Sequence, residues 1–117
     1  KSLSLLIAAL LVVPVPTFAA DAVKVDIYLA GQLQNSISLV GPNATVKFSP
    51  TDMPGSTLEL RLIAPEPVII EMKETMADGK GAEVIGRIKM PTPGSSFAVA
   101  EMKGAKFHSP YVLVRPN

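Results

Sequence analysis

The sequence predicts an all-β fold, an antiparallel β-sandwich of about seven to eight short strands. From residue 23 onward, apolar and polar residues alternate within short segments, and this period of two is typical of strands that have one buried face. Turn signals made of Gly, Pro, Asn and Asp separate the segments at intervals of about 8 to 12 residues. No segment carries a convincing 3.6-residue apolar spacing, so no helix is expected in this part of the chain.

The first three strands are predicted within residues 23–48. Segment 23–30 places a valine, isoleucine or leucine at every second position. A turn is expected over 31–35, followed by a short strand around Ile37 and Leu39 and a third strand over 44–48. Segment 49–56 contains two prolines and a glycine and is predicted to be the longest loop.

Two longer strands are predicted next. Segment 57–64 shows the strongest alternation, with leucines at three alternate positions. Pro65 and Pro67 interrupt it, because proline cannot donate to a ladder, and the inward set then continues over 68–72. Residues 71–77 are also compatible with a helix, but we expect a strand that fades into the turn at 78–81.

The last strands are expected over 82–90, from Phe97 to near Met102, and over 107–114. A domain of about 95 residues with strands this short favours an immunoglobulin-like sandwich over a ligand-holding barrel, which usually needs longer strands.

The first 22 residues have the features of a signal peptide, expected to form a helix. Lys1 precedes an apolar run from Leu3 to Val13, and prolines and small residues follow. We expect cleavage after one of the residues from Ala19 to Ala22, which leaves a single domain over 23–117. The alternative is an uncleaved segment that tethers the domain to the membrane.

The absence of cysteine, together with the short positive end and the alanine-rich cleavage site of the signal peptide, points to an exported bacterial protein. The chain has no cysteine, whereas small secreted domains of eukaryotes usually depend on disulfides. We therefore expect a periplasmic or secreted bacterial protein. The nearly balanced charge, with 11 basic and 10 acidic side chains, argues against nucleic-acid binding.

No arrangement of residues in the sequence predicts catalysis or a cofactor. The chain has one histidine, His108, which we expect to face solvent in the last strand, and a nucleophile needs a base beside it. Carboxylates of the predicted strands fall on the polar phase, where they are expected to pair with basic side chains across strands: Asp26, Glu59, Glu71 and Glu83, with Lys24, Arg61, Lys73 and Arg87. We expect a protein that is not an enzyme.

Methionine offers the one alternative chemistry. Thioether and imidazole groups are the soft ligands that suit Cu(I), which makes a small periplasmic copper-binding protein the rival hypothesis. Its candidate ligands are Met72, Met76, Met90, Met102 and His108. Against this, Met72 and Met90 fall in phase with core positions, where methionine fills gaps.

The sequence therefore favours a non-enzymatic binding or structural module of the bacterial envelope. We expect it to engage another envelope or secreted protein through a sheet face or edge. The candidate contact residues are Tyr28, which is out of phase with its strand's apolar side, and the last strand, Tyr111, Val112, Leu113 and Val114. That strand is apolar on both faces, so it is either a buried central strand or one that pairs between subunits. The sequence leaves the oligomeric state open.

Overall fold

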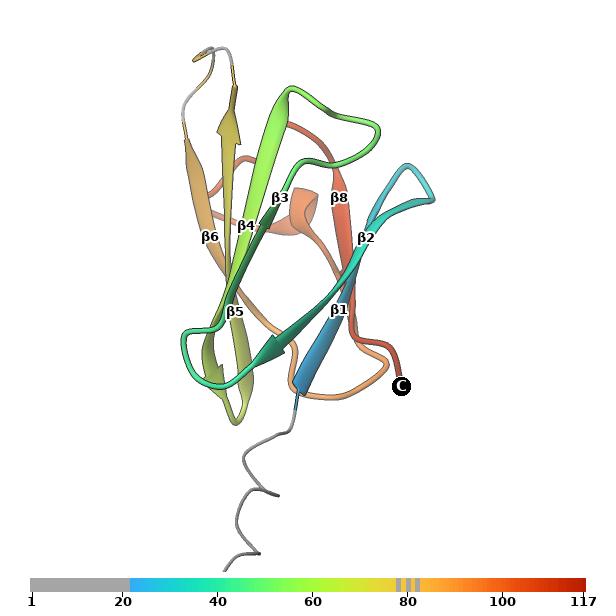
Figure 1. Cartoon of the computed structure of the whole chain (residues 1–117), viewed down its shortest axis with the longest axis vertical. Coiled ribbons are helices and arrows are strands. Elements are labelled where there is room, and N and C mark those ends of the chain that lie inside the picture. Colours follow the sequence, from blue (N-terminus) through green and yellow to red (C-terminus); the bar gives the residue numbers. More distant parts are fainter. Residues whose placement is uncertain (1–21, 78, 80, 82) are drawn as a thin grey trace, which may run out of the picture.

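The chain folds into two antiparallel sheets that pack face to face (Figure 1). The computed structural model describes residues 22–117 except positions 78, 80 and 82. The predicted all-β antiparallel sandwich is confirmed, whereas the predicted signal-peptide helix lies outside the described residues. Within the described part of the chain, no helix is long and apolar enough to cross a membrane.

Each sheet has four strands. Sheet A has the strand order β2-β1-β8-β7 and sheet B the order β3-β4-β5-β6. The strands are β1 (Ala22–Leu29), β2 (Gln32–Val40), β3 (Thr45–Phe48), β4 (Ser56–Pro65), β5 (Val68–Met76), β6 (Val84–Lys89), β7 (Ser96–Ala98) and β8 (Tyr111–Val114).

The strand order describes an up-and-down circuit. Within each sheet, strands that follow one another in the chain are paired, the chain passes from sheet A to sheet B after β2 and back after β6, and β8 pairs with β1. The likeness to an immunoglobulin domain therefore holds for the two packed antiparallel sheets, while the strand order lacks the crossing connections of a Greek key. Of the window 71–77, where a helix was the alternative, residues 71–76 belong to β5 and the predicted strand is confirmed.

The core is formed by the inward residues of both sheets. Val25 and Ile27 of β1 and Leu58 and Leu60 of β4 are fully buried, as is Leu113 of β8. Burying a side chain of this size stabilises the fold by about 1.5 to 3 kcal/mol relative to exposure.

The β1–β2 hairpin is tighter than the sequence predicts. The expected turn over 31–35 is wrong, because only Ala30 and Gly31 lie between the strands, both with positive φ (52° and 80°). Strand β2 begins at Gln32 and contains a bulge opposite Ile27, which shifts the register by one residue. The bulge turns Gln34 inward and leaves Leu33 exposed.

Gln34 fastens the bulged part of β2 to the loop before β4. Its amide nitrogen donates to the Asp52 carboxylate (2.8 Å), and its amide oxygen accepts from the Asp52 backbone N–H (2.9 Å). Gln34 is only 8% exposed, so these bonds satisfy a polar group that is nearly buried.

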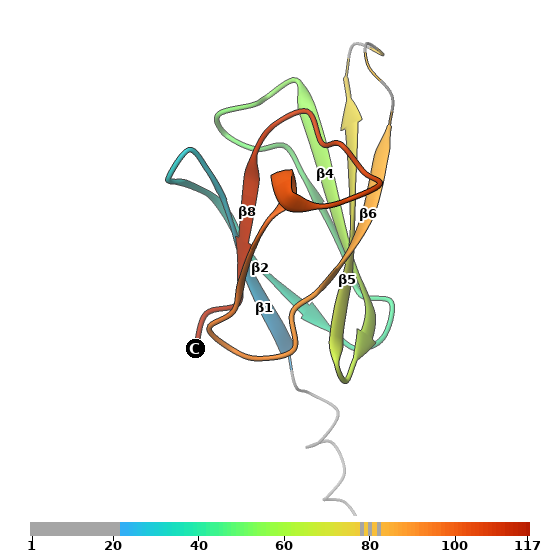
Figure 2. The same ribbon diagram turned by 180° about the vertical axis from the view of Figure 1, so that it is seen from behind.

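Residues 99–110 differ from the prediction. The strand expected from Phe97 to near Met102 ends at Ala98, and a 3₁₀ turn (Val99–Glu101) follows. The strand expected over 107–114 begins only at Tyr111, so His108 lies in an irregular segment before it. Figure 2 shows this segment running from β7 toward β6 and back to β8. Val99, the first residue of the 3₁₀ turn, is 1% exposed and belongs to the core.

The hairpin turn at Ala30 generates the first prediction. A non-glycine residue in the left-handed region costs about 1 to 2 kcal/mol, and asparagine tolerates this conformation best. We expect Ala30→Asn to raise the free energy of unfolding by about 1 kcal/mol and Ala30→Val to lower it. Urea denaturation measures both, and equal stability of the two variants would contradict the turn geometry.

Candidate functional site

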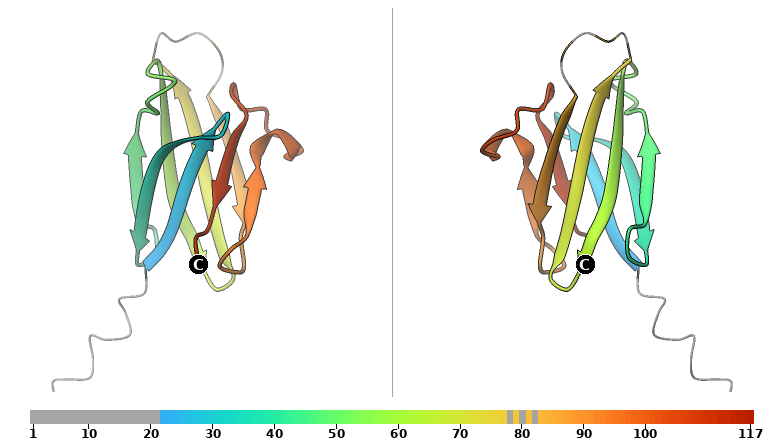
Figure 3. Two further views of the ribbon diagram at one scale, coloured as in Figure 1. Left: turned by 90° about the vertical axis from the view of Figure 1, so that its right-hand side faces the viewer. Right: turned by 90° about the vertical axis from the view of Figure 1, so that its left-hand side faces the viewer.

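The outer face of sheet A carries a row of apolar side chains that crosses all four strands. The register pairs Leu33 with Tyr28, Tyr28 with Val112 and Val112 with Ala98. Alternation places these side chains on the side away from the core. We call these four residues the apolar row; Val114 lies beside it on the same face. In the left view of Figure 3, sheet A lies toward the viewer.

Sheet A has few charges on this outer face. Lys24 and Asp26 are the two charged residues that its described strands direct outward. The most exposed apolar side chains of sheet A lie on its edge strand β2, where Leu33 is 51% and Val40 is 56% exposed; sheet B exposes one comparable side chain, Ile85, at 50%. An apolar strip with a polar surround is typical of a surface that contacts another protein.

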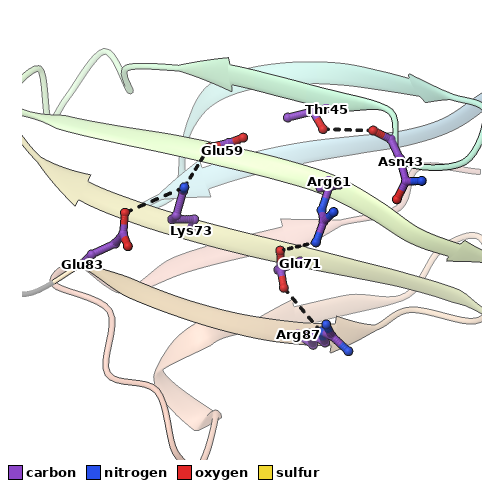
Figure 4. A network of polar contacts seen from close by, with 8 residues as sticks. All are labelled: Asn43, Thr45, Glu59, Arg61, Glu71, Lys73, Glu83 and Arg87. Carbon is purple, nitrogen blue, oxygen red and sulfur yellow. Dashed lines mark hydrogen bonds and ion pairs between the residues drawn. The ribbon is translucent and has the colours of Figure 1, made fainter.

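The outer face of sheet B has the opposite character. Figure 4 shows the network of charged side chains that crosses β4, β5 and β6. The Nζ of Lys73 lies 3.4 Å from Oε1 of Glu59 and 3.8 Å from Oε2 of Glu83. Two shallow hollows of about 270 and 240 Å³ lie among these side chains.

A second part of the network is centred on Glu71. One guanidinium nitrogen of Arg61 donates to it at 2.9 Å, and Nε of Arg87 donates at 3.4 Å. The hydrogen bond from Arg61 holds the pKa of Glu71 below its ordinary value of 4.5; burial opposes this, and the charges of both arginines support it. The predicted cross-strand pairing of Glu59, Glu71 and Glu83 is thus confirmed. Exposed pairs of this kind contribute about 1 kcal/mol or less each.

A buried polar cluster lies at the end of the core between β4, β5 and β8. Glu74 is 0% exposed, and its Oε1 accepts a 2.7 Å hydrogen bond from the backbone N–H of His108. Ser56, Ser109 and Tyr111 are also buried. Among the described residues, neither Oε2 of Glu74 nor the Tyr111 hydroxyl has a hydrogen-bond partner. Glu74 thus ties the irregular segment before β8 to sheet B.

The Tyr111 hydroxyl is perturbed by this environment. Burial raises the pKa of Tyr111 above its ordinary value of 10.0, and the negative charge of Glu74 acts in the same direction. The nearby hydroxyls of Ser56 and Ser109 act in the opposite direction, although their geometry is too poor for hydrogen bonds to Tyr111. The cluster therefore favours the neutral phenol.

The structure separates the predicted contact residues into two groups. Tyr28, Val112 and Val114 come together on the outer face of sheet A, whereas Tyr111 and Leu113 are fully buried. Strand β8 is paired on both sides, with β1 and β7, so it is the central strand of the two alternatives and its backbone does not pair between subunits. The open edges belong to β2, β7, β3 and β6.

The candidate copper ligands occupy different environments. Met72 and Met90 are 0% and 1% exposed within the core, Met76 and Met102 are half-buried, and His108 is exposed. Among the described residues, no group of three or more His, Asp or Glu side chains could hold a metal ion. Cu(I) binding by this set stays a prediction.

Sequence reasoning missed Leu33 and Glu74. The sequence places Leu33 in the predicted turn over 31–35, because a bulge has no local signature in its sequence. Glu74 could have been found, since it continues the inward phase of Val68, Ile70 and Met72 at the same spacing of two.

The hydrogen bond of Glu74 leads to a prediction about stability. Glu74→Gln keeps an acceptor for the His108 N–H, whereas Glu74→Leu leaves that partly buried donor without this acceptor. We expect the leucine variant to lose about 1 to 3 kcal/mol of unfolding free energy relative to the glutamine variant. Urea denaturation measures the free energy of unfolding of both variants. An equal decrease in the two would show that the hydrogen bond does not stabilise the fold.

The raised pKa of Tyr111 predicts a pH dependence. Its folded-state pKa lies above the unfolded value near 10.0, so its contribution to stability is complete below pH 10 and is lost as pH rises through the folded pKa. We expect the wild type to lose more stability than Tyr111→Phe between pH 9 and 11, a range chosen to span the ordinary tyrosine pKa of about 10. Thermal melts measure the Tm of both proteins across this range, and an equal fall in Tm for the two would contradict the raised pKa of Tyr111.

Comparison with known proteins adds no family to this description. No family model, no curated protein and no solved structure significantly matches the chain.

Proposed function

We propose that this protein is an exported, non-enzymatic binding or structural module of the bacterial envelope. Its outer face of sheet A engages another exported protein. The observation that carries the proposal is the contrast between the two outer faces, one apolar and charge-poor, the other crossed by paired charges.

The apolar row supports a protein partner over a small ligand. Its four residues lie side by side across a sheet face and do not surround a cavity. A flat apolar strip that includes a tyrosine suits the buried centre of a protein–protein interface, where aromatic residues are enriched and charged residues depleted.

The outer face of sheet B is a weaker candidate for the same role. Glu59, Glu71 and Lys73 already have oppositely charged partners on that face. A partner that covered them would remove paired charges from water, and this cost offsets much of the gain from contact.

A matched pair of photo-crosslinking residues tests the proposal. Leu33 on the face of sheet A and Ile85 on the face of sheet B are equally exposed, at 51% and 50%. With a photoreactive amino acid at each position in the exported protein, we expect a discrete protein adduct from position 33 and none from position 85. Mass spectrometry identifies the attached protein.

A surface variant completes the experiment. Tyr28→Glu adds a charge to the centre of the apolar row without touching the core, and we expect the position 33 adduct to fall about tenfold. Circular dichroism checks that the variant is folded. Adducts of equal yield from both positions, or an adduct that survives Tyr28→Glu in a folded protein, would refute the proposal.

A further inference from the structure

We infer that the partner of this face is a second copy of the same chain, packed sheet A against sheet A about a two-fold axis. The inference rests on the proposed function, since it names the protein that covers the β1 and β2 part of the apolar row. It follows from the self-complementary order of outward side chains along β1 and β2.

On β1, the outward residues of two copies are complementary in charge and size when the second β1 runs antiparallel above the first. With the axis level with Val25 and perpendicular to the strands, Lys24 of one copy faces Asp26 of the other. The same operation places Tyr28, the largest outward side chain of this strand, over Ala22, the smallest. The pair of copies thus has two opposite-charge contacts and two large-to-small contacts on β1.

On β2, the same axis gives a second set of matches. Leu33 is level with Tyr28, and Val40 is level with Ala22, because the register pairs them across β1 and β2. Leu33 of one copy therefore faces Val40 of the other, so the two most exposed apolar side chains of sheet A cover each other. Between them Ser36 faces Ser38, and neither carries a charge.

Charge selects this orientation over the other two-fold arrangement. An axis parallel to the strands would place Lys24 over Lys24 and Asp26 over Asp26 of the second copy. Like charges held together at an interface are costly, whereas opposite charges in the same positions fix the orientation. Sheets stacked face to face keep their strands within about 30° of each other, so the central contacts at Lys24 and Asp26 tolerate the twist.

A charge-exchange cycle tests this arrangement. The domain from residue 21 onward includes every described strand and the entire core, and its association is measured by analytical ultracentrifugation. We expect a dimer whose dissociation constant rises about tenfold with either Lys24→Asp or Asp26→Lys, each of which creates like-charge contacts. The double variant exchanges the two charges, and we expect it to restore dimerisation to near the wild-type level.

Controls separate this contact from general electrostatics and from folding. Lys47→Asp makes the same charge change on the outer face of sheet B, where we expect no effect on association. Circular dichroism confirms that every variant is folded. Since the chain has no cysteine, Ser36→Cys and Ser38→Cys variants carry single thiols, and a short bismaleimide should link a mixture of the two more efficiently than either alone.

The outcomes distinguish this inference from the proposed function. A monomeric wild type, or a double variant no better than the single reversals, would overturn the two-fold pair. If a monomeric protein still forms the Tyr28-dependent adduct from position 33 with a different exported protein, the proposed function stands and the second copy is excluded as its partner.

Discussion

Two sheets bury one face each against a common core, and this packing fixes the direction of nearly every side chain in the strands. Val25, Ile27 and Leu60 are withdrawn completely from water, and period-two alternation then directs their neighbours outward. The outer faces are therefore a consequence of the core. Tyr28 and Val112 meet on the surface of sheet A because Leu29 and Tyr111, their neighbours, are held inside.

The two outer faces differ in how their chemistry is satisfied. On sheet B, charges such as Glu71 and Lys73 have oppositely charged partners within the same face, so these charges need no partner from another protein. On sheet A, Leu33 and Val40 have no such partners within their own face and expose apolar surface instead. This difference connects the fold to the proposed role, because covering the face of sheet A removes apolar surface from water without separating paired charges from water.

The bulge in β2 and the irregular segment 99–110 each connect one part of the sandwich to another. The bulge in β2 directs Gln34 to Asp52, and residues 99–110 join sheet A to sheet B through the bond between Glu74 and the His108 N–H. In both places a nearly buried side chain accepts a hydrogen bond from the backbone N–H of a loop. Such bonds are expected, because a buried polar group without a hydrogen-bond partner is costly in surroundings of low polarity. Such contacts fix a loop at the cost of placing a polar group in the core.

The sequence by itself determined the fold class, most strands and the side of the sheet on which their residues lie, because alternation is a local property. It also predicted the pairing of Glu59, Glu71 and Glu83 with basic side chains, and it singled out Tyr28. The tertiary structure alone decided which strands are neighbours, and so made β8 central and joined Tyr28, Val112, Ala98 and Leu33 in one row. Strand pairing and bulges depend on contacts between residues distant in the chain, and periodicity within one segment cannot encode them.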